Sequence, residues 1–554
     1  MSVLRLAQLS VVLLGLLTCL NVFSEQTTPD TVCPDGSAAQ TVAKADFKEF
    51  VGRPIAGIVH HTIPVFDPND PREDNALYRL LNAIHVETRD GVIAGQLLFT
   101  VGDTIDVDRL AETERILRAR HYLNNAEVTV VGECGAAGVV LLVEVRDVWT
   151  LEPEVSLGRE GGENNHGFGF SEENFLGTGN SLFIGYDKDA DRSSIDYGFY
   201  SPHLFNTRIS AALAFADTSD GQQTIFSLTR PFYSLETPWS AGMNNADLSF
   251  VDTIRYHDED INAYKHEHES HSIFFGAALK VSTANTQRVI LGLEQDKQVF
   301  TVNEDTLQPI PENFNDVFPF IEYRFIANEF AVYTNLNQLH QVEDVSVGAD
   351  LRVRVGHGGE YFGNEDEFSK FTLVYSDLVG IGEHHLMKFK VALDSKNVIH
   401  DSVRSEAKWG GSVGYFYLAG EKHRWYASAS YDQGHQLQQH NELTAGGRGG
   451  LRGYPLDYQR GEKRYLVTIE KRYISDIHLF NLFRFGTAMY LDMGRAWGGG
   501  YSEASHLANV GVGLRMSSSK AKLGKVLHLD FAVPLVERDQ VSSFQWVITA
   551  SQSL

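Results

Sequence analysis

Hydrophobic residues recur at every second position in short segments from about residue 151 onward. Examples are 208–215 (RISAALAF), 508–516 (ANVGVGLRM), 527–533 (LHLDFAV) and 544–550 (FQWVITA). Successive side chains of a β-strand point to opposite faces, so this period of two predicts strands with one apolar face and one polar or small face. Counting such segments gives up to about 20 candidate strands, and the shorter segments are alternatively halves of one strand or lumenal segments.

The connections between these segments favour a transmembrane barrel over a soluble β-sandwich, which alternates in the same way. Long polar connections are expected at 257–271 and 356–368, and a tight turn at 419–422. Long loops at one rim and short turns at the other are typical of outer-membrane barrels, whose closure pairs every strand edge in lipid. We therefore predict an antiparallel barrel with an even number of strands over 150–554.

Residues 53–149 have a mixed pattern that predicts a small α/β domain. A strand is expected at 55–59, a short helix at 92–99, and a second helix that begins after Asp106. Two more strands are expected between 128 and 145, separated by glycines. The predicted order of elements is β-α-α-β-β.

Residues 1–24 predict a secretory signal peptide, because a basic start precedes the apolar run 11–20 and Ser24 precedes the expected cut. The run is shorter than the roughly 20 residues that span a bilayer, which argues against a membrane anchor. Acylation of Cys19 is a weaker alternative. Residues 25–52 are polar without a strong period, and we expect them to form a loose leader.

The composition argues against several classes of protein. Lys and Arg total 47 against 72 Asp and Glu, a formal net charge of -25, and phosphate binding requires a basic surface, so nucleic acid is not an expected partner. Three cysteines are too few for a disulfide-built scaffold. After secretion Cys33 and Cys134 lie in an oxidising compartment, where one disulfide and two free thiols are both consistent with the sequence.

No candidate for catalysis, metal or cofactor binding stands out, so the chain is not expected to be an enzyme. The glycine-rich stretch 446–453 lacks the lysine and threonine of a phosphate-binding loop and does not lie between a strand and a helix. A histidine and acid run is interpreted as a solvated outer loop with no metal. Its histidines are His257, His266, His268 and His271.

Four motifs follow one another along the predicted barrel: 174–179 (NFLGTG), 446–454 (GGRGGLRGY), 490–497 (YLDMGRAW), and 511–515 with 529–535 (GVGLR and LDFAVPL). They resemble the early turn, the lid loop, the late-strand aspartate motif and the last strands of the BamA/TamA superfamily of outer-membrane assembly and translocation barrels, the bacterial surface antigen type. Residues 97–130 resemble part of one POTRA domain, the periplasmic module that precedes these barrels.

The resemblance implies a single POTRA domain over 53–149 in the periplasm, followed by a barrel of sixteen strands in the outer membrane of a Gram-negative bacterium. The chain departs from the family in two respects. It has room for one POTRA domain where most known members carry two to five, and its end at 551–554 lacks a terminal aromatic residue.

Arg452 and Asp492 form the centre of the candidate site. Met489 and Leu491 belong to the apolar face of their strand, so the alternation directs Asp492 into the lumen, where a carboxylate requires a cation. The guanidinium of Arg452 can bind this carboxylate in a planar bidentate pair. The alternative is that Arg452 is an exposed loop charge that does not pair with Asp492. The resemblance implies the same pairing, with the lid folded into the barrel. The site residues are then Gly446, Gly447, Arg452, Gly453 and Tyr454 on the lid, and Tyr490, Asp492 and Gly494 on the wall.

The resemblance implies insertion or export of polypeptides without ATP. The expected partners are outer-membrane lipids, unfolded polypeptide clients that add a strand to the POTRA sheet edge, and accessory periplasmic proteins. The first and last strands, near 154–159 and 544–550, are expected to form a seam that opens sideways. The alternative functions are a passive pore or structural surface barrel, and lipid transport.

Overall fold

A computed structural model describes residues 33, 39–66, 71, 73–282, 284–399, 401, 404–501, 503–520 and 526–551. The predicted signal peptide and the last three residues lie outside the described residues. Among the helices of the described residues, none has the length and apolar character needed to cross a membrane.

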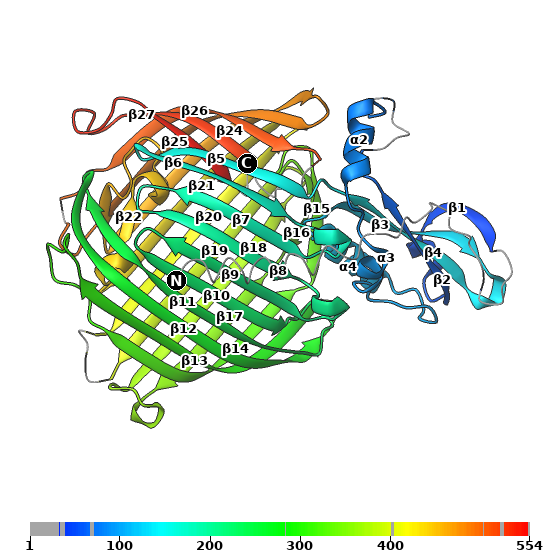
Figure 1. Ribbon diagram of the computed structural model, residues 1–554, viewed down its shortest axis with the longest axis horizontal. Helices are drawn as coiled ribbons and strands as arrows, with labels where there is room; N and C mark the ends of the chain where they lie inside the picture. The colour runs from blue at the N-terminus through cyan, green and yellow to red at the C-terminus, as the bar shows by residue number, and fades with distance from the viewer. Residues whose placement is uncertain are drawn as a thin grey trace, which may run out of the picture. The chain divides into compact units, whose positions relative to one another are not determined.

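Twenty antiparallel strands form a closed barrel within the described part of the chain (Figure 1). Neighbours in the barrel follow the order of the chain, and the last strand closes against the first. The count obtained from the alternating pattern is therefore confirmed, and the sixteen strands implied by the resemblance are wrong. The strands are β5 (Leu151–Glu160), β6 (Glu163–Glu172), β7 (Ser181–Lys188), β8 (Ser193–Ser201), β9 (Ser210–Thr218), β10 (Gly221–Arg230), β11 (Trp239–Tyr256), β12 (Glu259–Val281), β13 (Asn285–Val302), β14 (Phe314–Ala327), β17 (Asp350–Gly358), β18 (Phe368–Ile381), β19 (His385–Val398), β20 (Glu406–Ala419), β21 (His423–His435), β24 (Lys463–Leu479), β25 (Phe483–Trp497), β26 (Leu507–Ser518), β27 (Val526–Pro534) and β28 (Gln545–Ser551).

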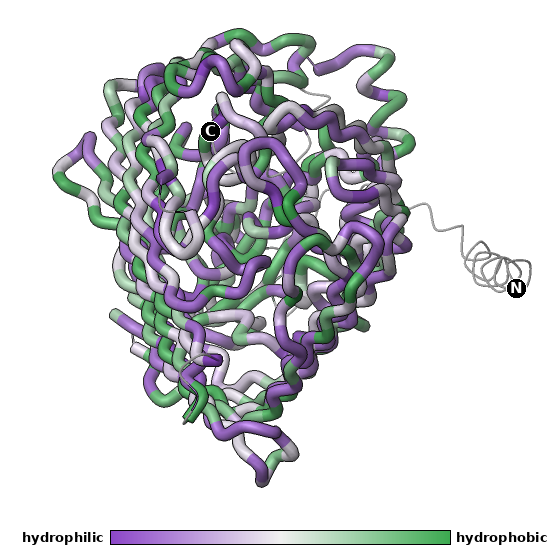
Figure 2. The backbone as a smooth tube through the Cα atoms, turned by 90° about the vertical axis from the view of Figure 1, so that its left-hand side faces the viewer, coloured by the Kyte–Doolittle hydropathy of each residue, from purple (hydrophilic) through white to green (hydrophobic). Residues whose placement is uncertain are grey.

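The two faces of each strand differ in polarity, as the period of two requires. In β25, Met489 is 63% exposed on the outer face, whereas its neighbours Ala488 and Tyr490 are buried on the inner face. Figure 2 shows hydrophobic and hydrophilic residues alternating along the strands. Outward apolar residues suit lipid, and inward polar residues pair with one another or with segments inside the barrel.

The connections lie at two rims, which we call the near rim, where β5 begins, and the far rim, where β5 ends. The expected long connection at 356–368 is present at the far rim as 359–367. The expected connection at 257–271 is wrong, because β12 begins at Glu259 and leaves a turn of His257 and Asp258. Its polar residues belong to a strand that pairs with two neighbours, so hydrophilicity did not indicate a loop there.

Within the described residues, the amino-terminal region has the predicted β-α-α-β-β elements, a 3-10 helix at Gly135–Ala137 between the last two strands, and three further elements that the pattern did not predict. The short helix α3 ends earlier than expected, because Gly95 follows it and the Gln96 side chain donates to the Val92 carbonyl. The predicted elements are β2 (Ile55–Ile63), α3 (Asp90–Ala94), α4 (Val107–Arg118), β3 (Leu123–Glu133) and β4 (Val139–Asp147), and the additional ones are β1 (Gln40–Asp46), a 3-10 helix (Phe47–Phe50) and α2 (Ala76–Ile84). The strands form a sheet in the order β1-β3-β4-β2.

The strand β1 lies in the segment expected to be a loose leader, so that expectation is wrong for residues 40–50. The strand pairs with β3 from Gln40–Glu133 to Asp46–Thr129, and the Asp46 side chain accepts from the Lys48 amide at the start of the 3-10 helix.

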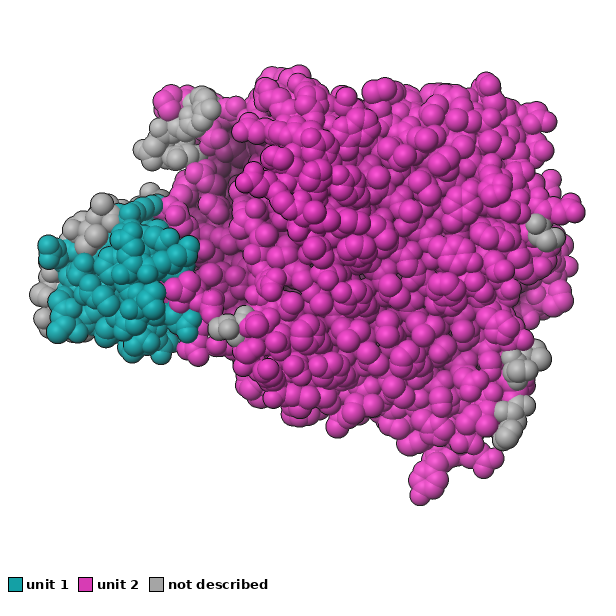
Figure 3. Space-filling model, turned by 180° about the vertical axis from the view of Figure 1, so that it is seen from behind, with its two compact units in different colours: residues 1–61, 100–106, 128–143 teal, residues 62–99, 107–127, 144–554 magenta. Residues whose placement is uncertain are grey.

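The chain divides into two compact units (Figure 3). One comprises residues 1–61, 100–106 and 128–143, and the other comprises 62–99, 107–127 and 144–554. The division does not fall at Trp149, where the sequence pattern changes. The helices α2, α3 and α4 belong to the same unit as the barrel, because they contact its near-rim turns.

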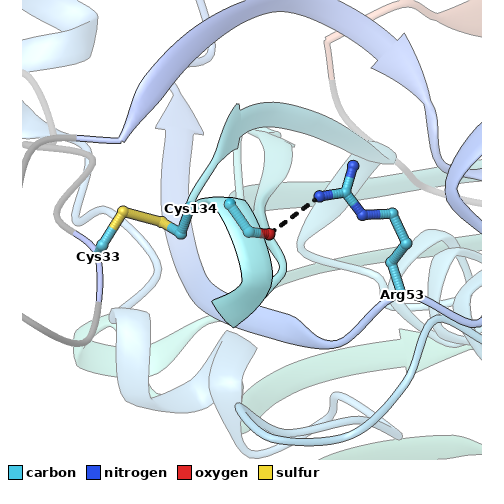
Figure 4. The surroundings of a disulfide bond; sticks show 4 residues. Cys33, Arg53 and Cys134 are labelled. Atoms are coloured by element: carbon cyan, nitrogen blue, oxygen red, sulfur yellow. Dashed lines mark hydrogen bonds between the residues drawn. A yellow bond between two sulfur atoms is a disulfide. The ribbon is translucent and has the colours of Figure 1, made fainter.

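A disulfide joins Cys33 and Cys134, which settles the two alternatives that the sequence left open (Figure 4). The bond closes a separation of 101 residues and ties the segment before β1 to the end of β3. Beside it, the Arg53 guanidinium donates to the Glu133 carboxylate at 2.7 Å and to the Gly135 carbonyl at 3.4 Å. The start of the sheet is therefore held by a covalent bond and by an ion pair.

We expect the double variant Cys33→Ser, Cys134→Ser to loosen the β1 edge, because the bond restricts the unfolded chain and typically contributes about 2–5 kcal/mol. Hydrogen exchange of the full-length protein should show faster exchange for the β1 amides and unchanged exchange for the barrel strands. Unchanged protection of β1 would contradict the stabilising role of the bond.

Candidate functional site: the lid loop

The segment between β21 and β24, which we call the lid, is a long far-rim connection with structure of its own. It contains 3-10 helices at Gln439–Asn441 and Gly447–Gly449, and the paired strands β22 (Leu443–Ala445) and β23 (Gln459–Gly461). Gly446 has a φ of 121°, which glycine adopts at little cost, and a side chain there would collide with the Pro455 carbonyl. The tight turn at Gly446 and Gly447 brings the following residues back against the barrel wall.

The structure brings Arg452 and Asp492 together in a bidentate ion pair. The Nε and Nη2 atoms of Arg452 each donate to one Asp492 carboxylate oxygen at 2.8 Å, and the Asp492 side chain is 1% exposed. Thr468 and Asn509 donate to the same carboxylate at 3.0 and 2.9 Å. The guanidinium also lies over the Tyr490 ring at 3.2 Å from its centroid. The planar guanidinium of Arg452 is thus bound along its edge by the Asp492 carboxylate and on its face by the Tyr490 ring.

Asp492 belongs to a larger buried network on the inner wall of β24 to β27. Arg452 also lies 3.4 Å from Glu470 and 3.6 Å from Asp530. Arg472 donates to Glu470 at 2.9 Å, and Arg515 donates to Asp530 at 2.8 Å. Three arginines therefore balance three carboxylates, and the lid supplies one of these arginines. Buried charges are tolerated when each has a partner of opposite sign.

Burial opposes the charge of Arg452, but its hydrogen bonds to Asp492 and the nearby carboxylates raise the pKa of the guanidinium above its ordinary value. Its carboxylate partners therefore favour the charged form of this lid residue. Arg452 is therefore not the exposed loop charge of the alternative interpretation.

Tyr454 fixes the lid by a second, mainly apolar contact. Its ring is fully buried with Leu451 and Tyr458 in a cluster on the inner wall. Its hydroxyl donates to the Ala508 carbonyl at 2.9 Å and to the Val536 carbonyl at 3.0 Å. This contact places the lid against the strand β26 and the loop that follows β27.

Two of the predicted glycines allow this close packing. A side chain at Gly453 would collide with Asn509, whose side-chain oxygen accepts from the Gly453 amide. A side chain at Gly494 would collide with Leu466 on β24. All of the predicted site residues therefore lie at or beside the surface that the lid shares with the barrel wall.

The sequence did not reveal that the lid also contacts the opposite wall. Arg460 donates to the Arg255 carbonyl at 3.0 Å and to the Glu442 carboxylate at 2.6 Å. The His257 amide donates to the Tyr458 carbonyl, and their rings stack at 4.8 Å. Because β11 and β26 lie nearly opposite in the barrel order, the lid crosses the lumen. The available signal was a basic residue shortly after the predicted lid motif, Arg460.

Within the described residues, the closing strands β28 and β5 share the shortest register of the barrel. Between β28 and β5 the described register is the single pair Ile548–Arg159, whereas β27 and β28 pair from Val526–Ser551 to Ala532–Gln545. The Arg159 guanidinium lies 5.6 Å from the centre of the Trp546 ring across this closure. The predicted first and last strands therefore meet, with one registered pair among the described residues.

The lid contacts both sides of this closure. A side chain at Gly161, in the turn after β5, would collide with the backbone nitrogen of Leu456. On the other side, the Tyr458 hydroxyl donates to Glu537 at 2.7 Å, in the loop that precedes β28. A change in lid position therefore alters contacts to both closing strands.

A second inserted segment, which we call the hairpin, lies at the opposite end of the barrel from the lid strand β22 (Figure 1). It consists of β15 (Glu329–Thr334) and β16 (Val342–Val347), between β14 and β17. Its tip residues pack on the barrel wall, Leu336 beside Leu386 and Leu339 beside Ile474. Because these contacts reach from β14 to β24, the hairpin extends across the near mouth. The extra length between two long strands was the signal for it.

The helix α4 holds the hairpin by charge. Arg118 donates to both carboxylate oxygens of Asp344, at 2.7 and 3.0 Å, and the Arg115 guanidinium lies 4.1 Å from the centre of the Phe330 ring. On the barrel side, Arg424 donates to the Asn335 carbonyl at 3.2 Å.

The NFLGTG motif connects the barrel to the segment before α3. Asn174 is buried in the turn between β6 and β7, donates to the Thr88 hydroxyl at 2.9 Å and accepts from the Gly179 amide at 2.7 Å. The Arg89 amide donates to the Gly177 carbonyl at 3.0 Å. This motif therefore joins the turn between β6 and β7, at the near rim, to the segment that precedes α3.

The histidine and acid run does not assemble into a metal site within the described residues, where no group of three or more suitable ligands occurs. His266 pairs with Asp252 at 2.8 Å, and His268 pairs with Asp296 at 3.1 Å. These partners lie on different neighbouring strands of β12, so the side chains are separated into individual pairs. The prediction of an outer loop at 257–271 is wrong, because residues 259–271 belong to the strand β12.

We expect Arg452→Ala to release the lid from the wall, because it leaves the network with three carboxylates and two arginines. Removing one partner of a buried pair costs about 3–5 kcal/mol. Asp492→Ala should give a similar loss, and the double variant should lose less than the sum, since it restores the charge balance. Thermal unfolding and single-channel conductance noise of the reconstituted protein measure these effects.

Arg404→Ala is the matched control, because Arg404 makes ion pairs with Glu312 and Asp366 in outer loops where exposed pairs contribute about 0–1 kcal/mol. Arg452→Lys keeps the charge without the bidentate geometry and should have an intermediate effect. Strictly additive losses for Arg452→Ala and Asp492→Ala would show that the two residues act independently.

Comparison with known proteins places this architecture in a family. The model of the Omp85 superfamily domain matches residues 174–552. No curated protein matches the chain.

Solved structures of similar fold include three large barrels, each with low sequence identity. BamA from Haemophilus ducreyi lacking POTRA domains 1-3 is 14% identical, with a TM-score of 0.39, and the match covers 90% of this chain and 85% of that chain. CdiB from Acinetobacter baumannii is 12% identical, with a TM-score of 0.44 over 90% and 73% of the two chains. CdiB from Escherichia coli is 12% identical, with a TM-score of 0.47 over 93% and 80%.

Proposed function

Because the chain belongs to the Omp85 superfamily and is an outer-membrane protein of a Gram-negative bacterium, we propose that it inserts or exports polypeptide clients through its barrel without ATP. Family membership supports an assembly or translocation barrel in general. What we propose beyond family membership is that the client is a polypeptide and that it passes through the barrel.

The observation that carries the proposal is the closure between β28 and β5. Among the described residues one registered pair, Ile548–Arg159, joins these strands, and separating them exposes two strand edges inside the membrane. An exposed edge offers unpaired backbone groups to an incoming strand, which is the basis of β-augmentation. The lid contacts both flanks of the closure, so we propose that movement of the lid controls its opening.

The amino-terminal region, over 53–149, is proposed to be a POTRA domain in the periplasm that receives the client. Its sheet has β2 at one edge and β1 at the other. We propose that an extended client adds to the β2 edge before it reaches the barrel, and that accessory periplasmic proteins bind the same region.

The lid and the hairpin argue against the alternative of a passive pore. One crosses the lumen and the other extends across the near mouth, and both are fixed by buried ion pairs or by apolar contacts. An open pore has no need for two such segments. Among the described residues, no contact in the barrel favours lipid over polypeptide as the transported molecule, and assays of client insertion and lipid transfer distinguish the two.

We expect a disulfide between Arg159→Cys and Ile548→Cys to abolish client insertion. Registered Cα partners in antiparallel strands lie about 4.5–5.5 Å apart, within the range that a disulfide spans. Insertion of a radiolabelled β-barrel client and secretion of an exported client by vesicles are the measurements, and activity should return after reduction.

The matched control is Leu529→Cys with Ile548→Cys, which joins β27 to β28 and leaves the closure free. Wild-type protein treated with the same reductant controls for loss of the Cys33–Cys134 bond. Full client activity with the closure locked would exclude the proposed route, and a selective loss of lipid transfer would support lipid transport.

A photoreactive residue at His61, on the edge strand β2, should capture a client chain in cells. The same residue at Lys44, on the edge strand β1, is the control, because both positions are exposed. Mass spectrometry should identify unfolded outer-membrane or secreted polypeptides at His61 preferentially. Equal capture at both edges, or capture of phospholipid alone, would argue against client addition at β2.

A further inference from the structure

The helix α2 exposes an apolar stripe on the side that does not pack against the protein. Leu77, Leu80 and Ile84 are 58%, 59% and 60% exposed. They recur at the spacing that places residues on one face of a helix. Val86, just after the helix, is also exposed and extends the stripe. A contiguous exposed apolar face marks a contact surface more often than isolated apolar residues do.

The opposite face of α2 fixes the helix to the near rim of the barrel. Tyr78 is buried, its ring stacks on Phe66 at 4.2 Å, and its hydroxyl donates to the Phe480 carbonyl in the turn between β24 and β25. Phe66 and Tyr78 pack in one cluster with Trp149 and Leu482. The apolar stripe is therefore an additional feature, because the helix is already docked through other residues.

The helix is also held by polar contacts that define its position. The Asn75 side chain accepts from the Tyr78 amide at 3.0 Å and caps its first turn. Lys520, in the turn after β26, donates to the Glu73 carboxylate and lies 5.2 Å from the centre of the Phe66 ring. Two near-rim turns thus hold α2 from both sides.

The near-rim end of β24 beside α2 is itself apolar and exposed. Ile477 and Leu479 are exposed at the end of the strand, and Phe480 is 71% exposed in the turn. These residues continue the outer face of β24, which carries Ile469 and faces lipid in an outer-membrane barrel. Through Tyr78, the helix α2 thus contacts the turn at the near-rim end of this apolar outer face.

We infer that α2 is an interfacial helix whose Leu77, Leu80 and Ile84 enter the phospholipid leaflet at the near rim. A short amphipathic helix that lies in the plane of a membrane surface inserts its apolar face at the boundary of headgroups and acyl chains. The contact with the Phe480 turn holds α2 at the edge of the membrane, so little further ordering accompanies insertion. This inference requires the barrel to lie in a membrane and does not depend on client transport.

The test uses the full-length protein in vesicles of phosphatidylethanolamine and phosphatidylglycerol. Single cysteines replace Leu77, Leu80 or Arg79 and carry a nitroxide label, and the native Cys33 and Cys134 are joined in a disulfide that excludes the label. Arg79 is exposed on a different face of α2 and is the matched control. Continuous-wave power saturation with oxygen and with a water-soluble nickel chelate measures the surroundings of each label.

We expect the oxygen-to-nickel accessibility ratio to be several-fold higher at Leu77 and Leu80 than at Arg79. A label at Val101, an exposed apolar position outside α2, should behave like the label at Arg79. Heat-modifiable migration in detergent gels verifies that each labelled barrel is folded. Equal ratios at Leu80 and Arg79 would overturn the inference, because both labels would then lie in water.

Low access of both reagents to Leu77 and Leu80 would also overturn the inference, since a second copy or another protein would then cover the stripe. A variant with Leu77→Ser, Leu80→Ser and Ile84→Ser provides an independent measurement. Its α2 amides should exchange faster than those of the wild type in vesicles and at the same rate in short-chain detergent without a bilayer. An equal increase in both media would indicate loss of helix stability and not loss of lipid contact.

Discussion

Backbone pairing in the membrane is the constraint on which the structure depends. Within lipid every strand edge requires a neighbour, so the barrel must close, and within the described residues the closure of β28 on β5 has one registered pair. A ring of this size also encloses more space than wall side chains fill, since barrels of sixteen to eighteen strands leave an aqueous channel. The lid and the hairpin occupy that space from the two ends, and each does so by contacts with the inner wall.

The charges inside the barrel follow from this arrangement. The network at Asp492 is neutral only when Arg452 is in place, because Arg472 and Arg515 leave one of the three carboxylates without compensation. The position of the lid is therefore coupled to the charge balance of the wall. The same lid contacts the turn after β5 and the loop before β28, so one segment connects the buried network to both flanks of the closure.

The near rim shows how the amino-terminal helices and the barrel share one unit. The turn after β6, the hairpin and the turn after β24 receive contacts from three places in the preceding chain: the segment before α3, α4 and α2. These contacts are made by backbone groups, by an ion pair and by a buried tyrosine. A domain boundary drawn at Trp149 therefore separates residues that fold against one another.

The alternating pattern, together with the lengths of the connections, predicted the barrel and up to about 20 strands. The pattern also gave the inward direction of Asp492, because the period of two is a local property of the backbone. Motif resemblance added Arg452 as the partner of that carboxylate. Local pattern did not reveal that β12 is a strand through its histidines, that residues 40–46 pair with β3, or that Leu77 and Leu80 lie on a helix. It also could not place Arg460 against β11 or the hairpin across the near mouth. Those contacts join residues that are distant in the chain, and only the closed barrel brings them within reach of each other.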